Sequence, residues 1–377
     1  MKKFLAVLLT LAMVFSLNGF AFAESAAEKT AMTPGTYEGS AQGQNGVVTV
    51  KVTVTDKEIE SIEVTEQQET PGIGAPLTEE GYEGTTPIVE IPKAIVENQT
   101  LEVDSVSGAT ITSYAVKSAV RNALKKAGAN VDEWKTPVAK PEATETAETY
   151  DVVVVGGGGA GLAAAISAKQ QGAETVLVLE KCGAVGGDTL VCGAIYNCPD
   201  EELQSKETLS DAKKAQIEAV LAKPTTADDE KELQDTVAAE WKAYQESGRT
   251  DIFDSDAWYA LQTFDGGDRV ANLDLVKVLC YNAKPGYDWI KSLGMEFHDT
   301  IGQGAGSLWQ RTHTSTMNMG TGFISTYVNN MAKMDGVKIM TSTTGKTLIK
   351  DENGNITGVT AEDVNGNTYT FTATKGV

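Results

Sequence analysis

Three glycines after an apolar run have the spacing of a turn that binds a dinucleotide. The run 151–155 reads as a buried parallel strand, and Gly156, Gly158 and Gly161 follow it directly. The first glycine permits a tight turn, the second lets the backbone approach a pyrophosphate, and the third lets a helix pack closely on the strand. The helix that begins at Ala160 then directs its N-terminal N–H groups and its dipole at the phosphates. The spacing therefore predicts a dinucleotide site at this turn.

An acidic residue stands where such a site needs one. Residues 175–179 are predicted to form the second strand of a βαβ unit, and Glu180 follows, about 20 residues after Gly161. A carboxylate at that distance can accept hydrogen bonds from both ribose hydroxyls of an adenosine. A Gly-rich turn with a purely structural role is the alternative, but the strand, the helix and the acid together favour dinucleotide binding. The motif alone does not choose between FAD and NAD.

These elements belong to the second of two predicted domains. The first domain, 33–130, has alternating β-branched and polar residues at 47–55, which predicts a half-buried strand that pairs with 59–64. Residues 113–127 have apolar side chains every four positions, and Gly128 stops the pattern. We therefore expect a small α+β domain that ends in an amphipathic helix.

A linker and a larger domain follow the first one. Residues 131–148 lose apolar periodicity and are rich in Pro, Ala, Thr and Glu, which is typical of a linker. The larger domain, 149–377, is predicted to be α/β and Rossmann-like, with a charged helical excursion over 201–340. Its last residues read as strands joined by Asn-Gly hairpin turns. No stop signal follows these strands, so we expect this domain to be incomplete at Val377.

The charge and the cysteines exclude several classes of site. The chain has 52 Asp and Glu against 31 Lys and Arg, a net charge of −21, and such a surface repels nucleic acid. None of its four cysteines forms a C-x-x-C pair, so no zinc-ribbon, iron–sulfur, c-type haem or other metal site is expected. Cys192 and Cys198 could form a disulfide in an exported protein, but buried free thiols are the favoured alternative.

The N-terminus reads as an export signal. Lys2 and Lys3 precede an apolar stretch at 4–17, and 21–23 has the small-x-small pattern that signal peptidase recognises. A membrane anchor is the alternative, but the stretch of about 14 residues is shorter than the roughly 20 that a spanning helix needs. We therefore expect residues 1–23 to be a signal peptide that directs the protein to the periplasm or the extracellular face of the membrane.

The second domain resembles a known flavoprotein family. The segments 179–181 (LEK), 186–189 (GGDT) and 193–194 (GA) are similar to the FAD-binding pattern of the fumarate reductase/succinate dehydrogenase flavoproteins, although Asp188 replaces the usual Asn. The resemblance covers most of the domain and implies that the dinucleotide is FAD. It also implies a further set of cofactor-binding residues. These are Lys181, Gly187, Asp188, Thr189, Gly193 and Ala194.

The same resemblance implies that the main catalytic residues lie outside this sequence. In the family, the arginine that donates a proton and most ligands of the substrate carboxylate come after the position of Val377. Within the chain only Arg311 and His313, in a segment similar to the family's RTH segment, are candidates on the substrate side. For His313 a histidine without a catalytic role, either packed or at the surface, is the favoured alternative.

The first domain resembles FMN-binding domains that carry their flavin covalently. Residues 104–110 (DSVSGAT) are similar to the D-x-x-(S/T)-G-A-T signature of those domains, and 69–72 (ETPG) is similar to a second segment of them. The resemblance implies that a flavin transferase joins FMN to the Thr110 hydroxyl as a phosphoester. The helix that follows offers a positive N-terminus to the phosphate. An ordinary helix entry, capped by Thr110 or Thr112, is the alternative.

Together the two resemblances imply a reductase with two flavins in series. Electrons from a membrane-side donor, such as a quinol or a flavin or cytochrome system, would pass from FMN to FAD. They would then pass as hydride to an α,β-unsaturated carboxylate such as fumarate or urocanate. One alternative is an FAD-dependent dehydrogenase or oxidase of a ketosteroid or an amino acid. Another is a flavin module that only carries electrons.

Overall fold

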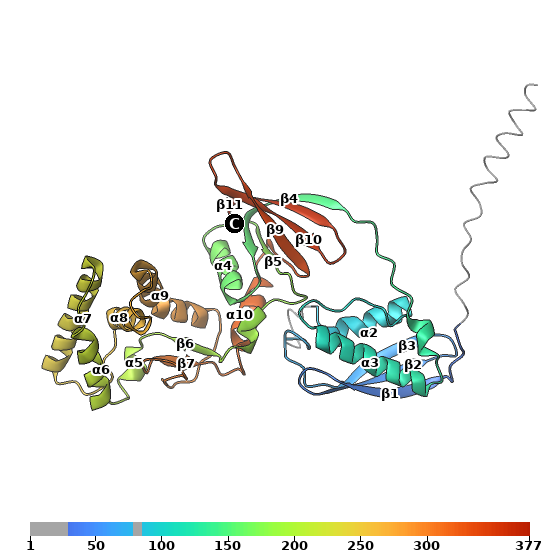
Figure 1. Ribbon diagram of the computed structural model, residues 1–377, viewed down its shortest axis with the longest axis horizontal. Coiled ribbons are helices and arrows are strands. Elements are labelled where there is room, and N and C mark those ends of the chain that lie inside the picture. The colour runs from blue at the N-terminus through green and yellow to red at the C-terminus, as the bar shows by residue number, and fades with distance from the viewer. Residues whose placement is uncertain (1–28, 78–84) are drawn as a thin grey trace, which may run out of the picture. The chain divides into compact units, whose positions relative to one another are not determined.

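The computed structural model describes residues 29–77 and 85–377 (Figure 1). The predicted signal peptide, 1–23, lies outside the described residues. By their internal contacts the described residues form two compact units. The first unit contains the described residues up to Gln68 together with Ile91–Asp104 and Tyr114–Val138. The second unit contains the described residues of Glu69–Glu90 together with Ser105–Ser113 and Ala139–Val377.

A three-stranded antiparallel sheet forms the centre of the first unit. Its strands are β1 (Gly35–Gln42), β2 (Val47–Val54) and β3 (Ile59–Glu66), with β2 in the middle. Alternate residues of β2 face one side of the sheet and are buried there, namely Val48, Val50, Val52 and Val54. The predicted strands at 47–55 and 59–64 are thereby confirmed.

Two helices follow this sheet in the chain, α2 (Pro87–Asn98) and α3 (Thr110–Lys126). Helix α3 has one completely buried side, formed by Val116, Val120 and Leu124. This side has the predicted four-residue spacing, although the helix begins at Thr110 instead of residue 113. A Cβ at Gly39 would lie 2.1 Å from the Ala119 carbonyl oxygen, so glycine is required for β1 to pack this closely on α3.

The segment predicted as a linker, 131–148, is partly structured. Val131–Trp134 forms a short 3-10 helix whose Trp134 side chain is buried, and the strand β4 already begins at Glu145. The Lys29 ammonium lies 3.6 Å from the centroid of the Trp134 ring. One large aromatic ring therefore fixes the start of this segment, although the segment has no apolar periodicity.

The second unit is built on a six-stranded mixed sheet. In spatial order its strands are β8 (Val337–Met340), β5 (Val176–Leu179), β4 (Glu145–Val155), β11 (Thr368–Gly376), β10 (Ile356–Asp363) and β9 (Thr343–Lys350). The first four are parallel, and β10 and β9 continue the sheet in antiparallel hairpins. Gly354 and Gly366 have positive φ angles of 83° and 86° in the two hairpin turns, as their Asn-Gly pairs predict.

Two helices cover one face of the parallel part of this sheet (Figure 1), α4 (Gly159–Gln170) and α10 (Thr321–Met331). Their buried side chains pack with Val176 and Val178 of β5, while the alternate residues Leu177 and Leu179 pack with side chains of β10 and β11. The succession β4–α4–β5 confirms the predicted βαβ unit and the Rossmann-like α/β fold.

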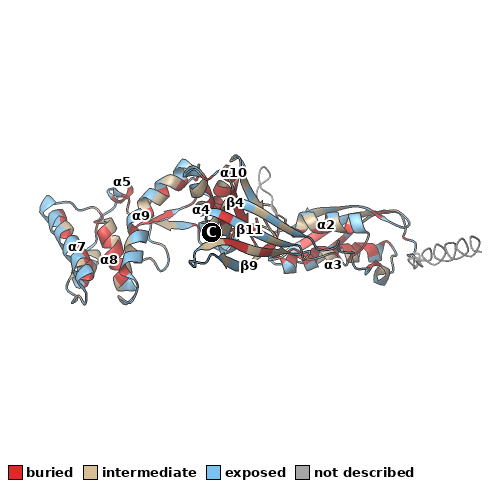
Figure 2. Cartoon of the chain, turned by 90° about the horizontal axis from the view of Figure 1, so that it is seen from above, coloured by how far each residue is buried: buried red, intermediate tan, exposed pale blue. Residues whose placement is uncertain are grey.

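A helical lobe is inserted between β6 (Ile195–Asn197) and β7 (Thr312–Thr314), which pair with each other. Its helices are α5 (Glu201–Gln204), α6 (Asp211–Leu221), α7 (Asp228–Ser247), α8 (Asp256–Gly266) and α9 (Leu273–Ser292). Helix α8 is buried along most of its length (Figure 2), and Trp258 packs edge-on against Trp309 in the core of the lobe. The lobe lies within the helical excursion predicted over 201–340, whereas α10 returns to the sheet.

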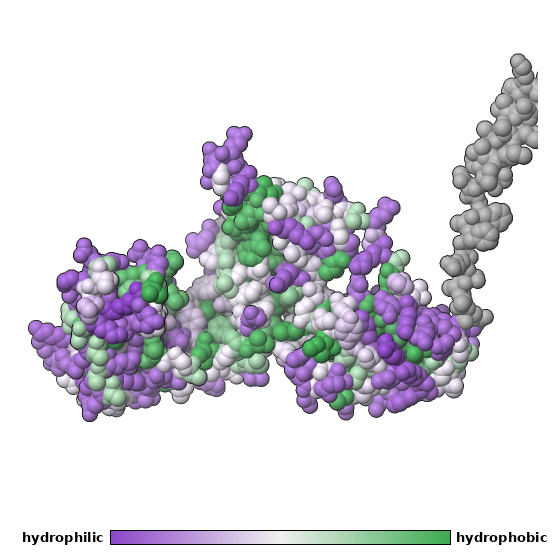
Figure 3. Space-filling view, in the orientation of Figure 1, coloured by the Kyte–Doolittle hydropathy of each residue, from purple (hydrophilic) through white to green (hydrophobic). Residues whose placement is uncertain are grey.

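Apolar side chains reach the surface of the lobe on α9 (Figure 3). They include Leu275, Val278 and Leu279, which are exposed. Even so, no helix within 29–77 or 85–377 combines the length and the apolar content that crossing a bilayer requires.

Candidate functional site

The glycine turn after β4 has the geometry that a dinucleotide site requires. A Cβ at Gly161 would lie 1.9 Å from the Gly156 carbonyl oxygen, so α4 can pack on the turn only with glycine there. The space beside Gly158 is open, because the nearest atom to a Cβ would be the Gly186 carbonyl oxygen at 3.9 Å. Gly158 precedes the first turn of α4, which contains Ala160, and offers no side chain that competes for its N–H groups. The turn therefore fits a pyrophosphate.

Glu180 ties this turn to the segment that follows β5. Its buried carboxylate accepts the Gly157 N–H at Oε2 and the Cys182 N–H at Oε1, with both hydrogen bonds 2.8 Å long. Each carboxylate oxygen has a second lone pair, so it can also accept a ribose hydroxyl as predicted. The structure thus gives Glu180 a second role, which is to fix the shape of the turn. The neighbouring Lys181 is exposed.

Part of the predicted cofactor segment lies at the N-terminus of α4. Gly187, Asp188 and Thr189 belong to a 3-10 helix, Gly187–Val191. The Thr189 hydroxyl accepts a hydrogen bond of 3.2 Å from the Gly159 N–H. This bond joins the 3-10 helix to the helix end that is predicted to bind the pyrophosphate.

The other part of that segment, Gly193 and Ala194, lies directly before β6. The Ala194 carbonyl oxygen accepts a hydrogen bond of 3.0 Å from the Ser315 N–H, just after β7. Ala194 has a positive φ of 57°, which is a strained conformation for a residue with a side chain. Strain of this kind persists where the surroundings hold the backbone firmly, and such positions cluster at ligand sites.

Of the three hydroxyls in the first turn of α3, only that of Thr110 lies on an exposed residue. Thr112 and Ser113 are buried. The Thr112 hydroxyl donates to the Glu69 carboxylate, and the Ser113 hydroxyl donates to the Ala109 carbonyl oxygen at 2.9 Å. Thr112 is therefore occupied by a contact with Glu69, and the Thr110 hydroxyl is the one that an external phosphate donor can reach.

The ETPG segment closes around this first turn of α3. The Thr70 carbonyl oxygen accepts hydrogen bonds from the N–H groups of Ile73 and Gly74, at 3.1 and 2.9 Å. A Cβ at Gly74 would lie 2.6 Å from the Glu69 Cβ and 3.0 Å from the Thr112 hydroxyl oxygen. Glycine is therefore needed for the loop to pass over the buried contact of Glu69 with Thr112. The two sequence segments that resemble FMN-binding domains thus form one local structure.

A small cavity within the second unit is lined by residues of both predicted cofactor segments. Its volume is about 170 Å³, and Ser107 and Gly108 line it together with Gly187 and Asp188. The Gly183 N–H donates to the Ser107 carbonyl oxygen at 3.0 Å. A larger hollow of about 620 Å³ on the helical lobe contains none of the predicted cofactor residues. Of these two cavities, only the smaller one is lined by residues of the predicted cofactor sites.

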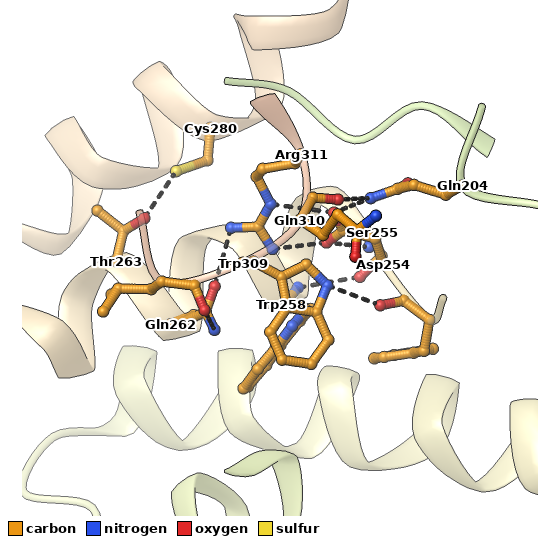
Figure 4. A network of polar contacts seen from close by, with 12 residues as sticks. Gln204, Asp254, Ser255, Trp258, Gln262, Thr263, Cys280, Trp309, Gln310 and Arg311 are labelled. Atoms are coloured by element: carbon orange, nitrogen blue, oxygen red, sulfur yellow. Dashed lines mark hydrogen bonds and ion pairs between the residues drawn. The ribbon is translucent and has the colours of Figure 1, made fainter. Parts of the chain in front are cut away.

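Arg311 belongs to a buried polar network that joins the start of β7 to the helical lobe (Figure 4). Its Nη2 and Nε donate to Asp254 Oδ1 and Oδ2 at 2.7 and 3.0 Å, and its Nη1 donates to Gln262 Oε1 at 3.0 Å. The guanidinium also lies 4.2 Å from the centroid of the Tyr259 ring. All three guanidinium nitrogens therefore bind protein groups, and the Asp254 carboxylate balances the positive charge of Arg311 inside the lobe.

His313 is completely buried among aromatic rings. Its ring centroid lies 4.1 Å from that of Tyr287, and the Phe297 ring packs edge-on at 6.4 Å. Neither ring nitrogen has a hydrogen-bond partner of normal geometry. Burial lowers the pKa of the imidazole, and the Asp200 carboxylate offsets this only in part. The neutral ring thus packs as an aromatic side chain. This agrees with the alternative that His313 is a packed histidine without a catalytic role.

Within the part of the chain that the structure describes, the cysteines and the potential metal-binding side chains form neither a disulfide nor a metal site. Cys198 and Cys280 are buried free thiols and Cys192 is an exposed one, so Cys192 and Cys198 do not form a disulfide. Within 29–77 and 85–377, no group of three His, Cys, Asp or Glu side chains could hold a metal ion.

Sequence reasoning missed two buried acids that hold the site residues in place. Glu69 was noticed only as part of the ETPG segment, and its position before a Pro-Gly turn was the one available signal. Asp254 is 57 positions away from its partner Arg311, and no local pattern points to it. Both contacts depend on the tertiary fold.

Comparisons with known proteins match both domains. A model of the FMN-binding domain matches residues 43–125, and a model of the FAD binding domain matches 151–243 and 241–377. The second model alone covers more than half of the chain. A solved flavocytochrome c3 fumarate reductase in its open conformation has 21% sequence identity and a TM-score of 0.45, over 61% of this chain and 33% of that chain.

Two curated relatives match most of the chain. The chain is 31% identical to NADH:acrylate oxidoreductase of Vibrio harveyi over 361 residues, which is 91% of this chain and 35% of the relative. It is 30% identical to urocanate reductase of Eggerthella lenta over 341 residues, which is 89% of this chain and 47% of the relative. The chain thus spans between about a third and about half of the length of these relatives. The chain belongs to the FAD binding domain family, among its fumarate-reductase-like flavoproteins, and carries an FMN-binding domain ahead of the FAD-binding one.

Proposed function

We propose that this chain is part of a flavin-dependent reductase that saturates the C=C bond of an α,β-unsaturated carboxylate. The observation that carries the proposal is the presence of an FMN-binding domain and an FAD-binding domain on one chain. In this proposal the FMN would be attached to Thr110, which is exposed, and the FAD would bind at the glycine turn, which is open beside Gly158. The names of the two relatives support the substrate class, because acrylate and urocanate are both unsaturated carboxylates.

The residues of this chain would bind and orient the FAD. The backbone at Gly158 and the N-terminus of α4 would hold the pyrophosphate, and Glu180 would accept the ribose hydroxyls. The Gly157 and Cys182 N–H groups would keep the Glu180 carboxylate in position for this. When bound, FAD supplies hydride transfer to carbon and FMN supplies electron transfer from a donor.

The FMN would be held by a covalent bond through Thr110. A flavin transferase would form the phosphoester, with the positive N-terminus of α3 beside the phosphate. The buried contact of Thr112 with Glu69 would keep the first turn of α3 in place while the Thr110 hydroxyl stays accessible. A tethered carrier is not lost by diffusion, which suits a protein that works outside the cytoplasm.

The electron donor and the location complete the proposal. With residues 1–23 as a signal peptide, the protein would work in the periplasm or on the extracellular face of the membrane, where a quinol or a flavin or cytochrome system supplies electrons. Sequencing of the mature protein should then find Glu24 as the first residue. An N-terminus that keeps residues 1–23 would contradict this part alone.

The activity is tested with the full-length protein under anaerobic conditions. Reduced methyl viologen serves as donor, and fumarate, urocanate and acrylate are offered separately. Oxidation of the dye by at least one of them, with the saturated acid as product, is the expected result. A protein that binds FAD and reduces none of them would contradict the proposal. A ketosteroid and an amino acid, offered with an oxidised dye, test the opposite direction of reaction.

A further inference from the structure

Helix α3 exposes two large apolar side chains beside Thr110. Ile111 is 56% exposed and Tyr114 is 60% exposed, whereas Val116 and Val120 on the opposite side of the helix are completely buried. Covering apolar surface of this kind is favourable in water. A group with an apolar surface is therefore expected to pack on this side of α3.

Helix geometry makes Tyr114 a neighbour of Thr110 on one side of α3. The two residues are four positions apart on one helix, so their Cβ atoms are neighbours at about 5–6 Å. Side chains of a helix lean toward its N-terminus, so we expect the tyrosine ring to lie on the side of the turn that begins with Thr110. Ile111, three positions before Tyr114, borders the same turn. Since all three residues belong to α3, the helix itself sets this arrangement.

Lys117 adds a positive charge at the edge of this side of the helix. Its Nζ lies 5.0 Å from the centroid of the Tyr114 ring and donates a hydrogen bond of 3.0 Å to the Val103 carbonyl oxygen. This bond holds the ammonium group beside the ring. A cation held there favours an electron-rich or anionic group that packs on Tyr114.

We propose that Thr110, Ile111 and Tyr114 form a platform on which the isoalloxazine ring of the tethered FMN packs, with Tyr114 against the ring and Lys117 beside it. The inference rests on the proposed attachment of FMN to Thr110. That attachment selects the occupant, because a phosphoester and a five-carbon ribityl chain easily span one helical turn, about 5.4 Å. A tether of this length also keeps the ring at a local concentration of about millimolar or more, which no diffusing ligand matches.

Contact with the platform would change the properties of the flavin. A tyrosine ring packed on isoalloxazine donates an electron to its excited state, which quenches the flavin fluorescence. The Lys117 ammonium would favour the reduced flavin, which carries more negative charge. Packing would also hold the ring in one orientation for electron transfer.

The test uses the full-length protein produced together with the flavin transferase. Intact mass first counts the covalent FMN. The native fluorescence per covalent flavin is then compared with that of the unfolded protein, and the Thr110→Ala protein supplies the FAD background. Three variants are compared with the unchanged chain. Tyr114→Leu keeps apolar bulk without the ring, Tyr114→Trp keeps a stacking electron donor, and Tyr281→Leu removes another exposed tyrosine, on α9, as the matched control.

The platform predicts native FMN fluorescence well below that of the unfolded chain, and a rise of at least threefold in Tyr114→Leu with one FMN still attached. Tyr114→Trp and Tyr281→Leu should stay as dim as the unchanged protein. Equal fluorescence in Tyr114→Leu and the unchanged chain would overturn the inference. If Tyr114→Leu takes up no FMN, the inference is tested on the unchanged chain alone. Equal FMN fluorescence of that chain in the native and the unfolded state would overturn the inference as well. Absence of FMN from the unchanged chain would instead refute the attachment, and the platform with it.

Discussion

Alanine substitutions at two glycines of the turn after β4 should impair different properties of the protein. At Gly158 the φ and ψ angles of −77° and −178° suit alanine, and its Cβ would meet nothing closer than 3.9 Å. At Gly161 the Cβ would lie 1.9 Å from the Gly156 carbonyl oxygen. Gly158→Ala is therefore expected to preserve the fold and weaken FAD binding, whereas Gly161→Ala is expected to destabilise the fold.

The size of each effect follows from these contacts. A methyl group at Gly158 keeps the pyrophosphate away from the backbone and removes about two charge-assisted hydrogen bonds of about 1.5 kcal/mol each. The loss of about 3 kcal/mol corresponds to roughly a 100-fold rise in Kd. The loss of a glycine N-cap costs the fold only about 0.5 kcal/mol. At Gly161 the helix must move by roughly 1 Å, and overpacking of this kind costs about 1–3 kcal/mol or more.

Both variants are measured in the same two assays. Calorimetric titration of the full-length apoprotein with FAD gives Kd, and thermal unfolding of the apoprotein gives Tm. We expect Gly158→Ala to keep its Tm within a few degrees and to lose affinity. Wild-type affinity in Gly158→Ala would refute the close approach of the pyrophosphate to this backbone. A wild-type Tm in Gly161→Ala would refute the tight packing of α4 on the turn.

Three further predictions concern buried polar groups. Thr112→Val removes a hydrogen-bond donor to the buried Glu69 carboxylate and should lower the free energy of unfolding, measured in urea, by about 2 kcal/mol. Thr112→Ser keeps the hydroxyl and should unfold with nearly the free energy of the unchanged chain. Equal losses in the two variants would contradict the role of the hydroxyl. Asp254→Ala leaves Arg311 buried without its carboxylate and should cost about 3–5 kcal/mol, so a loss below about 1 kcal/mol would refute the network. Burial lowers the pKa of His313 below the value of about 6.5 in the unfolded chain, so the unfolded state gains this proton at a higher pH than the folded state does. The free energy of unfolding should therefore decrease between pH 7.5 and 5.5, less steeply in His313→Phe, and identical slopes would contradict the buried neutral ring.

The parts of the fold that could be predicted are those encoded by neighbouring residues. The βαβ unit was predictable because an apolar run, a glycine turn at 156–161 and an acid at 180 lie within one short segment. The hairpins at Asn353-Gly354 and Asn365-Gly366 were predictable because these pairs favour the positive φ that a tight turn needs. Each of these signals is complete within about 30 residues.

The parts that could not be predicted depend on partners far apart in the sequence. Arg311 could be read as a substrate ligand until the fold placed Asp254 against it. His313 likewise has no local signal for its burial beside Tyr287. The spacing also gave no reason to expect Thr112 to be buried and Thr110 exposed, because that depends on how the ETPG loop packs on α3.

The central claim is that two flavins act in series, one bonded to Thr110 and one held by the glycine turn. Intact mass spectrometry of the full-length protein, made with and without the flavin transferase, tests it most directly, together with analysis of the flavin released on denaturation. We predict one covalent FMN per chain only when both the transferase and Thr110 are present, with one FAD released. A chain whose mass does not change with the transferase, or a Thr110→Ala chain that still carries the FMN, would contradict it.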